Sequence, residues 1–367
     1  MNHNRYAFLD GIRGMAAIFV LTRHTNNYWH FSLYRSYLAV DLFFILSGFV
    51  IAYAYDEKIK TGAITFQRFV LIRLIRLYPV FLLSLLISAI LLIGNLAIKH
   101  QVTFPNLSQA LSIIAITAIF LPSHMEGSYS LFPGNDHSLF PINDPYWSLF
   151  YELLSNFIYA AIRSLLNNVL LTTIVLLFGI SVTVVSRRHG NLDVGYLWNH
   201  GSLIAGFCRS IFGVFLGLFI YRHQAKFGQY FSKPNAAWAA FAVVAIILAS
   251  PSSERFDWVI DAFSVAIIFP IAVLCASQGK SSRLQGLLLM LGSVSYPIYV
   301  LHAPVGEIVA LLFRNIVESF APFSGVIFVL ILTTLSVWIE RYYDIPLRKL
   351  LSNYVFKRGH REKPAAS

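Results

Sequence analysis

Charged residues are scarce in this sequence. Of its 367 residues only 12% are Asp, Glu, Lys or Arg, whereas 57% are hydrophobic. An ordinary soluble protein carries about 25% charged residues, and a disordered chain contains few apolar ones. The composition therefore excludes an ordinary soluble enzyme and a solvated linker, and it indicates a chain that lies largely in lipid.

Cysteine is nearly absent as well. Cys208 and Cys275 both lie in apolar segments, and a single pair does not predict a disulfide. There is no Cys-x-x-Cys motif and the 11 histidines are scattered, so we predict no metal site and no permanently bound cofactor. The first apolar stretch is followed by TRHTNNYW (residues 22–29), which lacks the small residues of a signal-peptide cleavage site. We expect this stretch to remain in the membrane.

Long apolar segments recur along the chain. Tyr78–Ile98 contains no charged residue, and residues 286–312 contain one, Glu307. Runs of about 17–25 apolar residues match the thickness of a bilayer, and only helices satisfy the backbone there without closing a barrel. The sequence predicts an all-α polytopic membrane protein. We place about ten transmembrane helices at residues 12–30, 38–55, 78–97, 146–162, 168–186, 202–221, 236–251, 258–277, 286–312 and 323–341.

The distribution of lysine and arginine predicts the topology, because cytoplasmic loops are enriched in both. The tail from residue 341 onward is basic, whereas residues 122–145 contain neither residue type, so we expect both termini to be cytoplasmic and residues 122–145 to be external. Residues 107–121 are apolar but short, and a full span there would move the basic tail outside. We therefore predict a partial or re-entrant segment. The first inner loop then holds Lys58, Lys60, Arg68, Arg73 and Arg76.

The net charge of +11 needs no nucleic acid, since retention of basic loops at the inner leaflet explains most of it. The sequence has no internal repeat and no polar stretch long enough for a second, soluble domain. We predict one domain over residues 1–367.

Arg13 lies just before the first apolar stretch and His24 lies just after it. Eleven residues of helix span about 16 Å, and eleven steps of about 100° return to nearly the same face. Both side chains could therefore point into one cavity, with Arg13 near the cytoplasm and His24 towards the far side. The alternative is that each extends to its own membrane interface.

Six stretches resemble, in order, the motifs of the acyltransferase-3 family of integral membrane acyltransferases. In the last of them Asp344 stands where the family usually has glutamate. The resemblance extends over nearly the whole chain. The stretches are LDGIRGMAAIFVLTRH (9–24), VDLFFILSGFVIA (40–52), RLIRLYP (73–79), YWSLFYELLSNFIY (146–159), GSVSYPIYVLH (292–302) and RYYDIPLRK (341–349).

The resemblance implies an O-acetyltransferase-like enzyme of polysaccharide modification. Such an enzyme moves an acyl group, commonly acetyl from cytoplasmic acetyl-CoA, to a hydroxyl of a glycan, a glycolipid or another acceptor. Acyl-CoA would be a substrate rather than a resident cofactor. The sequence does not distinguish lipopolysaccharide, exopolysaccharide, a lipo-oligosaccharide, peptidoglycan or a small molecule as acceptor. It also leaves the acyl chain and the oligomeric state open, and the external stretch at residues 122–145 is our candidate for acceptor choice.

His24 is the predicted catalytic base, because imidazole titrates near neutral pH. An acylated His24 is the alternative, and we favour the general base. Arg13 would contact the donor or stabilise the thioester oxygen, unless it pairs with Asp10, three residues earlier. Arg73 and Arg76, one helical turn apart, suit the donor phosphates, unless they only anchor the loop to the inner leaflet.

Glu152 lies nearly two turns into its predicted span and could orient His24 or contact the acceptor. Asp41 is its rival, although it could simply cap a helix. Arg209 must be paired or line the cavity. His302 ranks third among the catalytic candidates, and Tyr296 joins it as a possible cavity residue in GSVSYPIYVLH. We attribute Ser47 to close helix packing beside its neighbouring glycine.

Two other functions compete with the enzyme. A transporter or flippase could use the same intramembrane charges as a substrate path, but it would predict repeated halves with interrupted spans, which the sequence does not have. A non-catalytic relative would be favoured by loss of Arg13, His24 or Glu152, and all three are present.

Overall fold

The computed structural model describes residues 6–98, 103–124, 137–233, 235–279 and 283–358, and within these ranges all regular secondary structure is helical. Five short elements precede or connect the longer ones: η1 (Asn26–Tyr28), η2 (Tyr34–Leu38), η3 (Glu254–Phe256), η4 (Ser264–Ile268) and η5 (Glu340–Asp344). The α-helices are α1 (Ala7–His24), α2 (Ala39–Lys60), α3 (Phe66–Ile98), α4 (Phe104–Ala118), α5 (Tyr146–Ile162), α6 (Asn168–His189), α7 (His200–Phe231), α8 (Ala236–Ala249), α9 (Asp257–Phe263), α10 (Phe269–Ser277), α11 (Gln285–Ser319), α12 (Phe323–Ile339) and α13 (Ile345–Arg358).

Helices cover each of the ten predicted spans, and within the described ranges seven helical stretches are long and apolar enough to cross a membrane. The three spans outside this group correspond to α1, α5 and α8, which have 18, 17 and 14 residues. The seven stretches are Tyr34–Lys60, Phe66–Ile98, Asn168–His189, His200–Phe231, Glu254–Ser277, Gln285–Ser319 and Phe323–Phe356.

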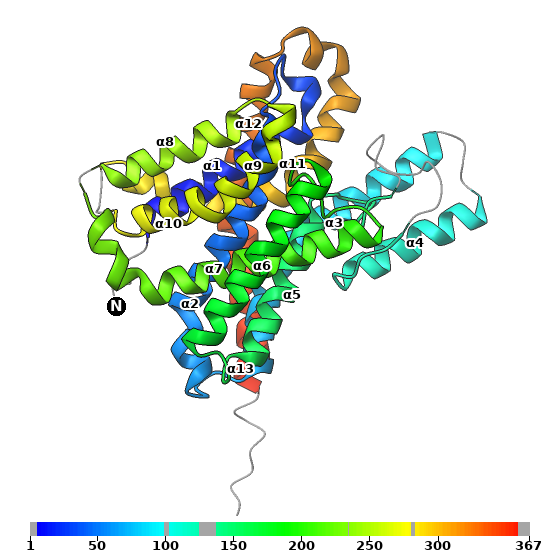
Figure 1. Ribbon diagram of the computed structural model, residues 1–367. Helices are drawn as coiled ribbons and strands as arrows, with labels where there is room; N and C mark the ends of the chain where they lie inside the picture. The colour runs from blue at the N-terminus through cyan, green and yellow to red at the C-terminus, as the bar shows by residue number, and fades with distance from the viewer. Residues whose placement is uncertain (1–5, 99–102, 125–136, 234, 280–282, 359–367) are drawn as a thin grey trace, which may run out of the picture.

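The segment predicted to be partial forms α4, a helix of 15 residues that is not among those seven. Thr103 accepts a hydrogen bond from the Asn106 amide at the start of α4, and Pro105 occupies its first turn, where a missing N–H is harmless. Helix α4 lies beside the distal part of α3, and the two project from the side of the bundle (Figure 1).

Close backbone contacts hold the centre of the bundle together. Helix α2 packs along α7, and a Cβ atom on Gly48 would lie 1.9 Å from the carbonyl oxygen of Val214. Helix α1 packs along α11, where a Cβ atom on Gly14 would lie 2.5 Å from the carbonyl oxygen of Leu291. Small residues at these positions let the helices approach closely, as is usual for helix pairs in lipid. Gly48 confirms the packing that we expected beside Ser47.

Buried ion pairs link helices that are distant in sequence. Arg35, which is 2% exposed, pairs with Asp257 and Asp261, which both belong to α9. Near the other end of α2, Asp56 pairs with Arg163 and Arg222. A charge in a low-dielectric interior is costly without a partner. These pairs therefore favour the packing of these particular segments against each other.

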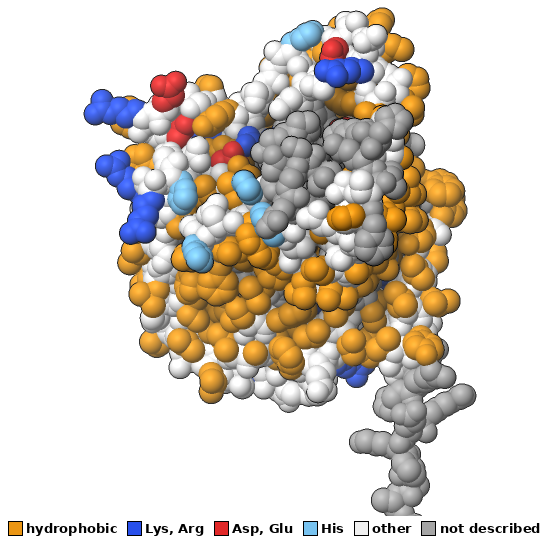
Figure 2. All heavy atoms as spheres, turned by 90° about the vertical axis from the view of Figure 1, so that its right-hand side faces the viewer, with side chains coloured by type: hydrophobic (Ala, Val, Ile, Leu, Met, Phe, Trp, Pro, Cys, Tyr) orange, Lys and Arg blue, Asp and Glu red, His pale blue; other side chains and the backbone are white. Residues whose placement is uncertain are grey.

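The outer surface fits a lipid environment. Figure 2 shows a broad band of hydrophobic side chains across the visible face, below a rim where charged side chains gather. Exposed residues such as Ile90, Leu176 and Leu330 are each about 60% accessible. A continuous apolar surface of this kind needs a cover in water, so the chain is an integral membrane protein.

Candidate active site

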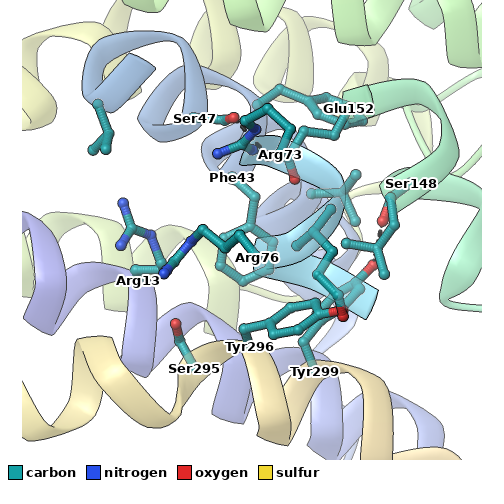
Figure 3. Close-up of a pocket in the computed structure, with 15 residues that line it drawn as sticks. Arg13, Phe43, Ser47, Arg73, Arg76, Ser148, Glu152, Ser295, Tyr296 and Tyr299 are labelled. Carbon is teal, nitrogen blue, oxygen red and sulfur yellow. Dashed lines mark hydrogen bonds and ion pairs between the residues drawn. The ribbon is translucent and has the colours of Figure 1, made fainter. Parts of the chain in front are cut away.

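A cavity of about 120 Å³ lies between α1, α2, α3, α5 and α11, and we call it the arginine cavity. In Figure 3, Arg13 and Arg76 lie together at one side of it, Arg73 reaches towards Glu152, and Tyr296 and Tyr299 lie along the opposite wall. The polar residues that line it are Arg13, Ser47, Arg73, Arg76, Ser148, Glu152, Ser295, Tyr296 and Tyr299.

The arginine cavity carries more positive than negative charge. Arg73 donates to Glu152 at 2.8 Å, and Arg13 donates to Asp10 at 3.1 Å. Within the described part of the chain Arg76 forms no ion pair, and its side chain is exposed. Three guanidinium groups against one carboxylate in the lining make the cavity suitable for an anionic ligand, because guanidinium groups bind phosphate oxygens in a bidentate manner.

A second cavity of about 250 Å³ contains His24, and we call it the histidine cavity. Its charged lining comes from α1, from the segment before α5, from the segment before α7 and from α7 itself. Arg23 pairs there with Asp193. The polar and aromatic residues that line the cavity are Arg23, His24, Asn26, Ser32, Ser36, Tyr37, Asp144, Trp147, Asp193, Tyr196, Arg209 and Tyr299.

The His24 ring has a defined tautomer. Its Nδ1 lies 3.0 Å from the carbonyl oxygen of Val20, one turn earlier in α1. Because a carbonyl only accepts hydrogen bonds, Nδ1 carries the proton and Nε2 keeps its lone pair. Nε2 has no hydrogen bond to any residue that the structure describes. A half-buried imidazole with an available lone pair can act as a base or as a nucleophile.

His302 lies beside His24, with ring centroids 5.0 Å apart. It is fully buried, and its Nδ1 lies 3.1 Å from the carbonyl oxygen of Ile298. Its Nε2 has no partner among the described residues. The protein therefore satisfies only one ring nitrogen of His302 within the described residues.

The two cavities adjoin. Val40 of α2 and Tyr299 of α11 line both of them. Arg13 and His24 thus lie on one continuous helix, as predicted, but they line two neighbouring cavities rather than one. The spacing of two residues along a helix fixes their face, whereas the walls between them come from α2 and α11, which the spacing cannot reveal.

Glu152 belongs to the arginine cavity, which corrects the expectation that it orients His24. Its carboxylate accepts hydrogen bonds from Ser47 at 2.6 Å and from Arg73 at 2.8 Å. The physical reason is charge pairing, since Arg73 is itself buried and needs a carboxylate. Ser47, which we had attributed to packing alone, is therefore also a polar contact of this cavity.

Asp41 and Arg209 form a buried pair that the sequence did not predict. Arg209 donates to the Asp41 carboxylate through Nε at 3.0 Å and through Nη2 at 2.6 Å, and both side chains are 1% exposed. Asp41 is thus the partner of Arg209 rather than a helix cap. Arg209 also lines the histidine cavity, and its guanidinium lies over the ring of Trp147.

Tyr296 contacts the backbone, since its hydroxyl donates to the Leu77 carbonyl at 2.7 Å. The ring still lines the arginine cavity, in agreement with its expected place in a cavity. Tyr299, Asp144 and Asp193 were missed as site residues. Tyr299 lies in GSVSYPIYVLH and Asp144 lies two residues before YWSLF, so position within or beside a motif could have indicated both. We find no comparable signal at Asp193.

Asp144 lies in the connecting segment before α5 and is one of the two carboxylic acids that line the histidine cavity, beside Asp193. Burial raises the pKa of its carboxyl to about 6, although a hydrogen bond from the Ser138 hydroxyl opposes the shift. This residue can therefore change its charge close to neutral pH.

Further cavities connect the arginine cavity to the end of the bundle where α13 lies. One of about 520 Å³ shares Arg13, Arg76 and Tyr296 with the arginine cavity and extends to Arg348. Another of about 570 Å³ shares Arg76 and Arg348 and extends to Lys349. Basic side chains, together with the carboxylates Asp10, Glu340 and Asp344, thus line a series of cavities that leads from α13 to the arginine cavity.

The comparisons with known proteins agree with this architecture. A family profile described as an acyltransferase domain matches residues 6–340, which ends before RYYDIPLRK. Protein 2 in the picA locus of Rhizobium radiobacter is 38% identical over 162 residues, which are 42% of this chain and 81% of that protein. A protein of Staphylococcus aureus (strain COL) named as a candidate O-acetyltransferase is 33% identical over 100 residues, 26% of this chain and 16% of that protein.

No solved structure matches the chain. The family profile nevertheless covers most of its length, and the matched region includes both cavities with His24, Arg13, Arg73 and Arg76. The chain therefore belongs to the acyltransferase-3 family and is an acyltransferase of the membrane.

Proposed function

We propose that the protein transfers an acyl group, acetyl in the simplest case, from cytoplasmic acyl-CoA to a hydroxyl of a glycan or glycolipid. The observation that carries this proposal is the pair of adjoining cavities. One is cationic and suits a phosphorylated donor, and the other presents an imidazole with an available lone pair. The relative named as a candidate O-acetyltransferase supports oxygen as the acceptor atom.

In this proposal the arginine cavity binds the donor. Coenzyme A carries several phosphate groups, and Arg13, Arg73 and Arg76 offer guanidinium groups to them or to the thioester oxygen. The cavities past Arg348 and Lys349, which Glu340 and Asp344 also line, support access from the end of the bundle where α13 lies. Tyr299 and Val40 then mark where the thioester meets the histidine cavity.

His24 acts on the acceptor. Its Nε2 takes the proton of the acceptor hydroxyl while the hydroxyl oxygen attacks the thioester carbonyl. The carbon–sulfur bond breaks, coenzyme A leaves as the thiolate, and the proton on His24 is then passed to that sulfur or to water. Attack by Nε2 itself, with an acyl-imidazole intermediate, is the alternative.

The proposed topology is the one that brings the donor to its cavity. Ten helices cross the bacterial cytoplasmic membrane, α4 enters it only in part, and both termini are cytoplasmic. The distribution of lysine and arginine supports this orientation. Residues 125–136 of the external stretch, our candidate for acceptor choice, lie outside the described residues.

The test of the acceptor side uses purified protein in nanodiscs, radiolabelled acetyl-CoA and a glycan mixture. We expect His24→Ala to lose label transfer by about 10²–10⁴-fold while still binding coenzyme A. His223→Ala is the matched control, because His223 Nδ1 also lies 2.9 Å from a carbonyl one turn earlier and the residue lines neither cavity. Equal losses in the two variants would contradict a role for His24.

The test of the donor side measures KM for acetyl-CoA. Arg76→Ala and Arg13→Ala should raise KM, whereas Arg68→Ala, an exposed arginine on α3 that lines neither cavity, should not. If the wild type neither binds nor turns over coenzyme A, the proposed donor is wrong and the transporter alternative gains weight.

A further inference from the structure

Tyr299 occupies the boundary between the two cavities. It lines both, and the only other described residue common to the two linings is Val40. The tyrosine comes from α11 and the valine from α2, so the boundary is a contact between two helices rather than a loop. Any group that passes from one cavity to the other must pass these side chains.

The Tyr299 side chain is held firmly in this position. Its hydroxyl lies 2.5 Å from the Ser148 hydroxyl and donates to the Pro145 carbonyl at 3.3 Å. Its ring meets the ring of Phe43 edge to face, with centroids 5.4 Å apart. The Tyr299 ring also contacts the His302 ring, with centroids 6.1 Å apart. A buried aromatic ring fixed by two polar contacts and two ring contacts has few alternative rotamers, so it forms a rigid wall.

The acyl group is the part of the donor that must reach this wall. If the arginines bind the phosphates, the thioester lies at the deep end of the arginine cavity, and its carbonyl must meet a hydroxyl beside His24. The surroundings there are apolar, with Val40, Phe43 and the Tyr299 ring. The cavity volume of about 120 Å³ leaves little room for a long acyl chain beside the rest of the donor.

We propose that the Tyr299 ring, together with Val40, limits the length of the acyl chain that the enzyme transfers. This inference rests on the proposed acyl-CoA-dependent function. A rigid ring excludes additional methylene groups by overlap, and one methylene group in a hydrophobic pocket changes selectivity by about 10- to 200-fold. The selected substrate class is therefore short-chain acyl-CoA.

The experiment compares kcat/KM for acetyl-, butyryl- and hexanoyl-CoA in the full-length protein. Tyr299→Ala should raise the hexanoyl-to-acetyl ratio at least about 10-fold. Tyr299→Phe should keep the wild-type ratio, because it keeps the ring. Val40→Ala opens the same boundary from α2 and should shift the ratio in the same direction, so the test does not depend on folding of a single variant. Tyr230→Ala removes an exposed tyrosine outside both cavities and serves as the control.

The outcomes separate this inference from the proposed function. If the two alanine variants turn over acetyl-CoA with the wild-type ratio, the size limit is overturned and the proposed function stands. A ratio in Tyr299→Phe that shifts as far as in Tyr299→Ala would assign selectivity to the hydroxyl and would also overturn the size limit. If the wild type turns over no acyl-CoA, both proposals fail.

Discussion

At the scale of single residues, the hydrogen bond from Nδ1 to the Val20 carbonyl leaves His24 Nε2 able to act in two ways. As a base it needs an acceptor hydroxyl before the thioester can break. As a nucleophile it would release coenzyme A once per enzyme even without an acceptor, which is the kinetic sign of a covalent intermediate. The ring geometry is the same in both cases, so kinetics must decide.

We predict that the wild type releases no burst of coenzyme A when it is mixed with acetyl-CoA in the absence of acceptor, because we favour the general base. Rapid-quench measurements of free thiol check this, with His24→Ala as the blank. A burst equal to the enzyme concentration, together with an acetyl group on the peptide that contains His24, would establish the acyl-histidine instead.

Asp144 leads to a pH-dependent prediction for stability. Burial raises the pKa of its carboxyl in the folded state to about 6, from an ordinary value of 3.8. Protonation of Asp144 therefore contributes to the free energy of unfolding. The contribution is fully present below pH 3.8 and is lost as the pH rises through about 6. Between pH 4.5 and 7.5 the loss amounts to roughly 2 kcal/mol.

Asp144→Asn keeps an acceptor for Ser138 but cannot ionise. We expect the melting midpoint of the variant, relative to the wild type, to rise by a few degrees between pH 4.5 and pH 7.5. Thermal unfolding in detergent at several pH values measures this. A difference that stays constant with pH would show that Asp144 is not buried as a neutral acid.

At the scale of helices, Gly48 is the contact that decides how closely α2 and α7 approach. A Cβ atom there would lie 1.9 Å from the Val214 carbonyl oxygen, whereas one on Gly94 of α3 would meet nothing within 4 Å. We predict that Gly48→Ala lowers the melting midpoint and the yield of folded protein, since the backbone must shift. Gly94→Ala should be neutral or slightly stabilising, because alanine favours helix. Equal behaviour of the two variants would contradict this packing.

The helices were the part of the fold that the sequence predicted best. Hydropathy and length depend on consecutive residues, so the span predicted at 146–162 coincides with α5, and residues 107–121 proved to be a short helix. Breaks within helical stretches escaped prediction. The π-helical η4 and η5 depend on the local hydrogen-bond register, for which the sequence carries no distinct pattern.

The candidate site was predictable residue by residue but not in its pairings. Motif positions identified Arg13, His24, Arg73 and Arg76, which line the two cavities. Glu152 was assigned to the wrong neighbour, because the depth of a residue within its own span does not tell which helix it faces. For the same reason Asp41 remained without its partner Arg209, which lies 168 positions away.

At the scale of the whole molecule, the cavities form a sequence of spaces that runs from α13 past Arg348 and Arg76 to Tyr299 and His24. Every adjacent pair of these cavities shares at least two lining residues. In the proposed function the donor enters this sequence at the α13 end and the acceptor reaches His24 at the other end, which gives the reaction one polarity across the membrane.

The polarity of the reaction is testable in membrane vesicles, because acetyl-CoA is too polar to cross a bilayer. In the topology that we propose both termini are cytoplasmic, so inverted vesicles would expose the route past Arg348 to the medium. External acetyl-CoA should then support transfer to acceptor enclosed in the vesicle. Right-side-out vesicles with the same donor outside should show no transfer while they are intact. Transfer should appear once the vesicles are permeabilised and the donor can enter. A protease-sensitive tag after the C-terminal residue, Ser367, reports the orientation of each preparation independently. Transfer in right-side-out vesicles whose tag is protected would reverse the assigned donor side, even though the chemistry at His24 would remain the same.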